Sequence, residues 1–234
     1  MMNEVMLSLD IETMDIGPEA AVLSIGARIF TKDGPTKGFE VFIDQNLAQQ
    51  FGTLSMDTIK WWNKQDPLVY EKVFGGRLHP SDAVHQFMQF VAQHQPETVW
   101  ANSPSFDCVI LRHLFKQVNL TFPFHFTVER DFRTLFAIGR DINVDTRDCW
   151  EGMRAHMALD DATAQAKAGA RILTKIYGPT LSAAAMQERL GDLADEKITV
   201  STIAALEGLD SVPPSTGSAS KSRGRASPPS ETSK

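Results

Sequence analysis

The chain has 234 residues and a net charge of −6, and its 42% hydrophobic and 22% charged residues exclude a wholly disordered protein. No apolar run approaches the roughly 20 residues that a membrane-spanning helix needs, so we expect no membrane association. We expect no signal peptide, because residues 1–4 lack a basic segment. Cys108 and Cys149 lack the paired spacing of a disulfide framework or a zinc site, which favours a cytoplasmic protein.

The length fits one domain with additional residues at its end. We expect a folded domain over residues 1–180, a helical extension over 181–210 and a disordered tail over 211–234. The tail carries a charge of +3, so the preceding residues carry −9. Such an acidic body lacks the basic surface typical of nucleic-acid binding, unless its carboxylates gather divalent cations that supply positive charge at a phosphate.

Hydrophobic periodicity predicts strands at the start of the chain. Residues 5–11 alternate apolar and polar side chains, with Asp10 on the polar face and Glu12 continuing it, as in a half-buried strand. Turn residues then separate two further predicted strands, at 21–30 and 38–43. Three strands with short connections predict an antiparallel meander.

Helical and strand patterns alternate through the rest of the domain. We predict helices at 57–64, 81–93, 106–118, 133–138 and 159–177, and strands at 98–101 and 126–129. Ser81 is the expected cap of the second helix. A meander followed by alternating strands and helices predicts an α/β fold, in which helices flank a mixed sheet of antiparallel and parallel strands.

Two carboxylates lie at the end of the first predicted strand. Asp10 and Glu12 are two residues apart, so they project from the same face, about 7 Å apart along the chain. Burial of two like charges is costly unless a positive group offsets them, and a hard divalent cation with oxygen ligands does so. An isolated pair of this kind is also typical of a solvated strand end, so this pattern alone leaves both interpretations open.

Three further side chains could join this pair. Asp107 follows the strand at 98–101, where α/β folds place ligands, although an acid in a first helical turn also suits the helix dipole. His156 and Asp161 are five residues apart and cannot share one helical face, so we place His156 on the loop before the helix. We expect Asp160 to cap that helix, which leaves Asp161 without a structural role. The face predicted to pack on the sheet comprises Ala162, Ala166, Gly169, Leu173 and Ile176.

These residues resemble the motifs of the DEDDh branch of the DnaQ-like exonucleases, which have a ribonuclease H-like fold. The D-x-E motif matches Asp10 and Glu12, the second acidic motif matches Asp107, and the H-x4-D motif matches His156 and Asp161. The resemblance extends over about residues 6–177. It is closest to bacterial and phage exonucleases of the exodeoxyribonuclease VIII-like and Rv2179c-like 3′-5′ exoribonuclease types, on the stretches 57–62, 102–111, 130–134 and 156–167.

The resemblance implies a 3′-5′ exonuclease domain over residues 1–180 that releases nucleoside 5′-monophosphates from single-stranded DNA or RNA. By the same resemblance, Asp10, Glu12 and Asp161 hold one Mg²⁺ or Mn²⁺ ion. Asp10 holds a second ion together with Asp107, which acts directly or through water. His156 removes a proton from the attacking water, a role that suits histidine because its side chain titrates near neutral pH.

We expect residues near the first motif to hold the 3′ end of the strand. Thr13 and Met14 could contact the terminal nucleotide through their backbone, and Arg133 could bind a phosphate or pair with an acid of the site. Trp61 and Trp62 point about 100° apart on a helix, so one of them could stack on a base while the other packs in the core. Trp62 is the candidate for the substrate contact.

The sequence leaves the preferred substrate open between RNA, DNA and short oligonucleotides. Two other functions are compatible with the same residues: a catalytically silent nucleic-acid-binding module of the same fold, and a metal-dependent phosphodiesterase with another substrate. The basic tail could add weak, salt-sensitive affinity for nucleic acid. A homodimer is compatible with the resemblance, because similar folds are often dimers, but no sequence pattern identifies an interface.

Overall fold

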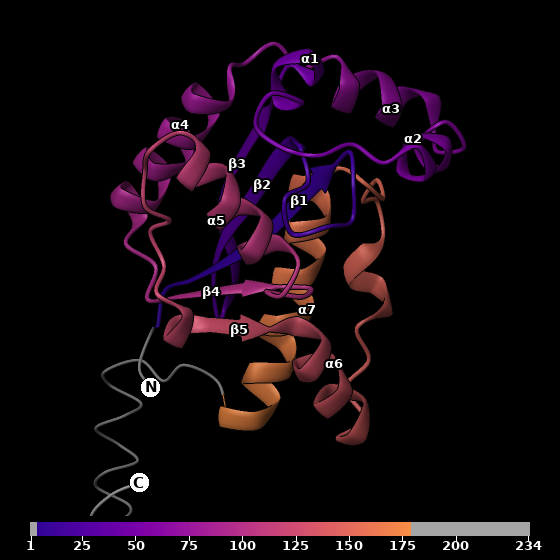
Figure 1. The fold of residues 1–234 in the computed structure, drawn as a ribbon. Helices are drawn as coiled ribbons and strands as arrows, with labels where there is room; N and C mark the ends of the chain where they lie inside the picture. The colour runs from indigo at the N-terminus through magenta and orange to yellow at the C-terminus, as the bar shows by residue number, and fades with distance from the viewer. Residues whose placement is uncertain (1–3, 179–234) are drawn as a thin grey trace, which may run out of the picture. The chain divides into compact units, whose positions relative to one another are not determined.

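The computed structural model describes residues 4–178, so the predicted extension over 181–210 and the predicted tail over 211–234 lie outside the described residues. Helices cover both faces of one sheet (Figure 1), and no helix within residues 4–178 is long and apolar enough to cross a bilayer. In chain order the elements are β1 (Met6–Thr13), β2 (Val22–Thr31), β3 (Gly34–Phe42), α1 (Gln45–Ala48), α2 (Met56–Trp62), α3 (Pro67–Phe74), α4 (Pro80–His94), β4 (Thr98–Ala101), α5 (Asp107–Gln117), the 3-10 helix η1 (Phe126–Val128), β5 (Glu129–Asp131), α6 (Phe132–Asp141), the 3-10 helix η2 (Arg147–Trp150) and α7 (Ala158–Tyr177).

The sheet has five strands in the order β3-β2-β1-β4-β5. Strands β1, β2 and β3 form the predicted antiparallel meander, and β4 and β5 run parallel to β1, which confirms the mixed α/β fold. Because β1, β4 and β5 point in one direction, their C-terminal ends share one edge of the sheet. Asp10 and Glu12, the loop after β4 and the start of α6 therefore lie along that edge.

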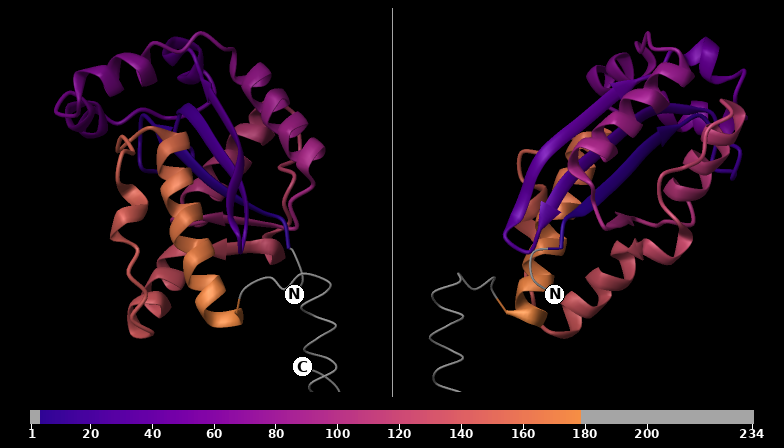
Figure 2. Two further views of the ribbon diagram at one scale, coloured as in Figure 1. Left: turned by 180° about the vertical axis from the view of Figure 1, so that it is seen from behind. Right: turned by 90° about the vertical axis from the view of Figure 1, so that its left-hand side faces the viewer.

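Side-chain alternation along β1 decides which helices its residues face. Leu7, Leu9 and Ile11 belong to the larger apolar core with the buried side chains of α4 and α5. Asp10 projects from the other face and contacts Gln165 of α7. Figure 2 shows α7 on the face of the sheet opposite α4 and α5. The carboxylates of β1 therefore lie on the side of the sheet that α7 covers.

The first turn of α7 approaches β2 very closely. Gly26 of β2 pairs with Asp10 of β1. A Cβ atom at Gly26 would lie 2.1 Å from the carbonyl carbon of Ala158 and 2.3 Å from the backbone nitrogen of Leu159. Real Cβ contacts with backbone are never this short, so only glycine lets α7 begin beside Asp10.

Most predicted elements are confirmed with their ends moved by a few residues, but one predicted strand is wrong and some short helices were not predicted. The strand predicted at 126–129 is wrong, because residues 126–128 form η1 and the strand that pairs with β4 is Glu129–Asp131. Helices α1 and α3 and the 3-10 helix η2 were not predicted. Pro67 is the first residue of α3, where a missing N–H costs nothing.

Two predicted caps and one packing residue are also wrong. His79, not Ser81, caps α4, because its ring accepts a hydrogen bond from the backbone N–H of Ser81. Asp160 does not cap α7, whose N-cap Met157 has no side-chain acceptor; the Asp160 carboxylate instead accepts the backbone N–H of Arg154 at 3.0 Å. The predicted packing face of α7 is buried except at its end, where Ile176 is exposed.

We predict that Gly26→Ala lowers the free energy of unfolding by about 3 kcal/mol, because a clash with backbone cannot be relieved by a change of rotamer. Urea unfolding of the full chain measures this loss. Gly17→Ala is the matched control, since its Cβ would meet only the Asp15 carboxylate at 3.8 Å, an ordinary contact. Equal losses in the two variants would contradict the close-packing explanation.

Candidate active site

Five polar side chains that are distant in the sequence line one cleft of about 730 Å³. Asp10 and Glu12 come from the end of β1, and Asp107 comes from the first turn of α5. His156 comes from the loop before α7, as predicted, and Asp161 from the first turn of α7. The structure thus brings together all five residues that the sequence singled out as candidate catalytic groups.

His156 and Asp161 are linked directly. The backbone N–H of His156 donates to Asp161 Oδ2 at 2.8 Å, and potential ligand atoms of Glu12, His156 and Asp161 lie within 4.8 Å of one another. His156 has a φ of 66°, a left-handed backbone conformation that non-glycine residues adopt only when their surroundings hold them there. Its ring packs edge-on against Trp61, with 4.8 Å between the ring centroids.

Hydrogen bonds also connect α5 and α7 to β1. The backbone N–H of Ile11 donates to Asp107 Oδ1 at 3.3 Å, and this N–H lies between the two acids of β1. The Gln165 amide nitrogen of α7 donates to Asp10 Oδ1 at 2.9 Å. Glu12 and Asp107 are buried. The carboxylates therefore converge in a poorly solvated environment, where like charges repel strongly.

Burial and mutual repulsion act on the two acids of β1. The pKa of Asp10 is raised well above its usual value, first by burial and then by the charges of the other three carboxylates, while the hydrogen bond from Gln165 opposes the rise. The pKa of Glu12 is raised in the same way, by burial and then by the charges of Asp161 and Asp107. Neither acid carries its negative charge easily without a compensating cation.

The two acids at helix N-termini are partly compensated. Burial raises the pKa of Asp107 to about 7, although backbone N–H groups and the charge of Arg133 oppose the rise. Burial also raises the pKa of Asp161, and the hydrogen bond from His156 opposes it. These opposing contacts favour the charged forms of both acids at the start of a helix, where the helix dipole also favours negative charge.

The protein supplies little positive charge to the cleft. Among residues 4–178, Arg133 is the one lysine or arginine in its lining. Arg133 Nε and Nη2 donate to the side-chain and backbone oxygens of Asn102, each at 3.3 Å, rather than to a carboxylate. Four carboxylates thus face one guanidinium group. A set of oxygen donors with this excess of negative charge fits a hard divalent cation.

Three residues predicted to contact the substrate, Thr13, Met14 and Trp62, have little exposed surface. Trp62 is only 1% exposed, and its indole N–H donates to the backbone oxygen of Thr13 at 2.9 Å, so its ring is largely core. Met14 is buried, and its backbone N–H and oxygen are bonded to Ala21 and Ser55. The backbone N–H of Met14 is therefore already bonded within the protein. The nearly buried Thr13 and Trp62 still line a smaller hollow of about 430 Å³.

Two exposed tryptophans stand at the cleft. Trp61, 42% exposed, lines both the cleft and the smaller hollow, and Trp150 of η2, 38% exposed, lines the cleft. The Asp148 carboxylate accepts two hydrogen bonds from Arg171 of α7, at 2.5 and 2.9 Å, which anchor η2. Sequence reasoning missed Trp150, because no periodic pattern marks its loop.

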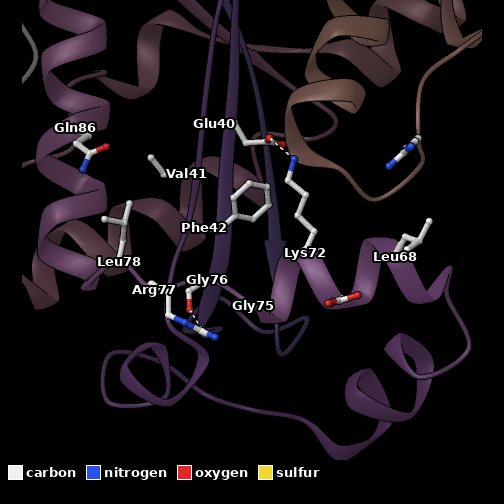
Figure 3. A pocket seen from close by; sticks show the side chains of 12 residues that line it. Glu40, Val41, Phe42, Leu68, Lys72, Gly75, Gly76, Arg77, Leu78 and Gln86 are labelled. Atoms are coloured by element: carbon white, nitrogen blue, oxygen red, sulfur yellow. Dashed lines mark hydrogen bonds and ion pairs between the residues drawn. The ribbon is translucent and has the colours of Figure 1, made fainter.

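A hollow beside β3 lies apart from these groups. It measures about 840 Å³ and is lined by parts of β3, α3 and α4 together with Arg154 (Figure 3). Lys72 points toward Glu40, with 3.9 Å between its nitrogen and the carboxylate, and Arg77 donates to the backbone of Gly76. None of the five candidate catalytic residues lines this hollow.

The sheet and the convergent acids agree with the resemblance of the sequence motifs to the ribonuclease H-like DEDDh exonucleases. Residues 4–173 match the family described as the 3′-5′ exoribonuclease Rv2179c-like domain, and the chain belongs to that family. Residues 4–173 are accordingly a 3′-5′ exonuclease domain, as the resemblance of the sequence motifs implied. No curated protein matches the chain in sequence.

Several solved structures share the fold. Cell-death related nuclease 4 (CRN-4) has a TM-score of 0.55 and 16% identity over 74% of this chain; the chain spans 64% of the CRN-4 structure, slightly less than two thirds. The nuclease domain of 3′hExo, a DEDDh family member bound to rAMP, has a TM-score of 0.52 and 13% identity over 77% of this chain and 96% of that domain. Pop2p of S. pombe, in its Mg²⁺- and Mn²⁺-bound form, has a TM-score of 0.51 and 13% identity over 77% of this chain and 87% of Pop2p.

The raised pKa of Asp107 makes the stability of the metal-free protein depend on pH. The pKa rises from 3.8 to about 7, so between these values the folded chain holds a proton that the unfolded chain has released. Stability from this group is therefore fully present below about pH 4 and is lost as the pH rises through about 7.

We predict that Asp107→Asn raises the free energy of unfolding of the metal-free protein at pH 8 by roughly 2 kcal/mol and has little effect near pH 3.5. Asparagine removes the charge but keeps an oxygen for the N–H of Ile11. Urea unfolding with a chelator present measures the difference. Asp57→Asn, at an exposed ion pair with Lys60, should show no such pH dependence. A stabilisation of Asp107→Asn that is equal at both pH values would refute the electrostatic explanation.

Proposed function

We propose that this 3′-5′ exonuclease is an exoribonuclease that removes nucleoside 5′-monophosphates one at a time from single-stranded RNA, with two Mg²⁺ or Mn²⁺ ions. The observation that carries the proposal is the convergence of four carboxylates and His156 in one cleft. The family description supports RNA as the substrate. The structures of 3′hExo with rAMP and of Pop2p with Mg²⁺ and Mn²⁺ support a nucleotide and divalent cations in this fold.

The carboxylates are the proposed cation ligands. When bound, two divalent cations neutralise charge at the scissile phosphate and activate water for in-line attack. Asp10, Glu12 and Asp161 would hold one cation, and Asp10 together with Asp107 would hold the other. Burial raises the pKa of Asp10, Glu12 and Asp107 and so favours their protonated forms. The side chains must be ionised to bind a cation, so cation binding releases these protons.

His156 is the proposed general base. Its backbone is fixed by the bond to Asp161 and its ring is held against Trp61, so a ring nitrogen can accept a proton from the attacking water at the same edge of the cleft. A positioned base of this kind typically contributes a factor of about 10²–10⁴ in rate. Because His156 lies close to Glu12 and Asp161, it could instead be a ligand of the cation. An experiment must therefore distinguish a general base from a metal ligand.

The cleft favours a single strand over a duplex in this proposal. Trp61 and Trp150 present exposed rings within the lining of one cleft, and unpaired bases stack on such rings. Arg133, held by Asn102, would bind a backbone phosphate. A duplex would have to unpair before its bases could reach either ring.

We predict that the full chain with Mn²⁺ or Mg²⁺ shortens 5′-labelled single-stranded RNA one nucleotide at a time from the 3′ end. Gel analysis of matched RNA, DNA and duplex oligonucleotides measures the preference, and chromatography identifies the product as 5′-monophosphates. Asp10→Ala should abolish the activity, and a chelator should do so reversibly.

Two results would contradict parts of this proposal. Faster degradation of DNA than of RNA would refute the ribonuclease assignment while leaving the exonuclease intact. Tight binding without cleavage of any oligonucleotide, at any concentration of Mn²⁺, would instead indicate a nucleic-acid-binding module.

We predict that His156→Ala lowers kcat on RNA by a factor of about 10²–10⁴ but changes the affinity for Mn²⁺ by less than about twofold. Single-turnover assays at saturating Mn²⁺ measure the rate, and calorimetric titration measures the affinity. His85→Ala, which replaces an exposed histidine of α4, is the control and should match the unmodified chain. A large loss of Mn²⁺ affinity in His156→Ala would show that His156 is a ligand rather than the base.

A further inference from the structure

Gln165 of α7 is a buried polar residue beside the proposed cation ligands. It lies four residues after Asp161, so the two side chains occupy the same face of the helix one turn apart. Gln165 is 4% exposed and lines the cleft. This placement brings an uncharged amide to the point where α7 meets β1.

The amide has a defined orientation. Gln165 Nε2 donates to Asp10 Oδ1 at 2.9 Å. A carboxylate that binds a cation is ionised and only accepts hydrogen bonds, so the same orientation suits the cation-bound protein. The other end of the amide, Oε1, is buried and receives no hydrogen bond from any residue between 4 and 178. Buried amide oxygens nearly always have a donor, so this arrangement points to a donor that enters with a ligand.

A neutral donor suits this position better than a charged one. A lysine or arginine at 165 would hold Asp10 too, but its charge would compete with a divalent cation for the same carboxylate. Glutamine fixes one oxygen of Asp10 and leaves the net charge of the cleft unchanged. Substitution of a residue that holds a metal ligand in this way typically weakens metal affinity by about 10–100-fold.

We infer that Gln165 is a positioning residue of the cation site: it fixes Asp10 Oδ1 so that the other carboxylate oxygen faces the cations, and its Oε1 accepts a hydrogen bond from water that accompanies them. The inference rests on the proposed function, because it assigns Asp10 to cation binding. It predicts how tightly the chain binds Mn²⁺ without nucleic acid, and this affinity can be measured separately from nuclease activity.

The test compares the full chain with Gln165→Met, which keeps the length of the side chain and removes both polar atoms. Calorimetric titration with Mn²⁺ in the absence of nucleic acid should show affinity on the order of ten-fold weaker. The Mn²⁺ concentration for half-maximal activity on RNA should rise by the same factor. At saturating Mn²⁺ the KM for RNA should be unchanged, because Gln165 is not assigned a contact with the strand.

Two further variants separate positioning from stability. Thr174→Val removes a hydrogen bond from the far end of the same helix, where Thr174 Oγ1 donates to the backbone oxygen of Lys32 at 2.7 Å, and should leave Mn²⁺ affinity unchanged. Gln165→Ala also lacks the donor and should weaken Mn²⁺ binding as Gln165→Met does. Unfolding transitions recorded by circular dichroism verify that each variant is folded.

Unchanged Mn²⁺ affinity in Gln165→Met would overturn the inference. It would also be overturned if only Gln165→Ala weakened binding, since lost packing would then be the cause, or if Thr174→Val weakened binding equally. The proposed function fails by a different result, which is an unmodified chain that binds Mn²⁺ but degrades no RNA. The two failures are therefore distinguishable.

Discussion

The contact between the start of α7 and strand β2 is the constraint on which the site depends. Gly26 lies opposite Asp10 in the sheet, and the backbone at Ala158 and Leu159 occupies the space that any side chain at 26 would need. This contact places Asp161 beside the acids of β1. The same edge of the sheet receives Asp107, because β4 runs parallel to β1 and leads into α5.

The packing that forms the site also concentrates negative charge in it. Four carboxylates converge where Arg133 is the one arginine or lysine of the described lining, and burial raises the pKa of each acid. Hydrophobic packing of α4, α5 and α7 on the sheet must offset this cost in the metal-free protein. The acids therefore lower the stability of the metal-free protein, and in the proposed function bound cations would offset that loss.

The exposure of the two tryptophans at the cleft depends on contacts elsewhere in the structure. Trp61 and Trp62 are adjacent in α2, so helical geometry requires them to point in different directions, and the burial of Trp62 under a bond to Thr13 leaves Trp61 exposed. Trp150 is held at the cleft because Arg171 of α7 bonds to Asp148, which belongs to the same 3-10 helix, η2. One helix therefore supplies Asp161, orients Asp10 and anchors an aromatic wall.

The sequence by itself determined the mixed α/β fold and the five candidate catalytic residues, because periodicity and motif spacing are local properties of the chain. It also implied that one of the two adjacent tryptophans is core. Only the tertiary structure decided which tryptophan is buried, that His79 rather than Ser81 caps α4, and that Gln165 bonds to Asp10. Those outcomes depend on contacts between distant segments or on competition between local hydrogen bonds. The periodicity of the sequence contains no information about either.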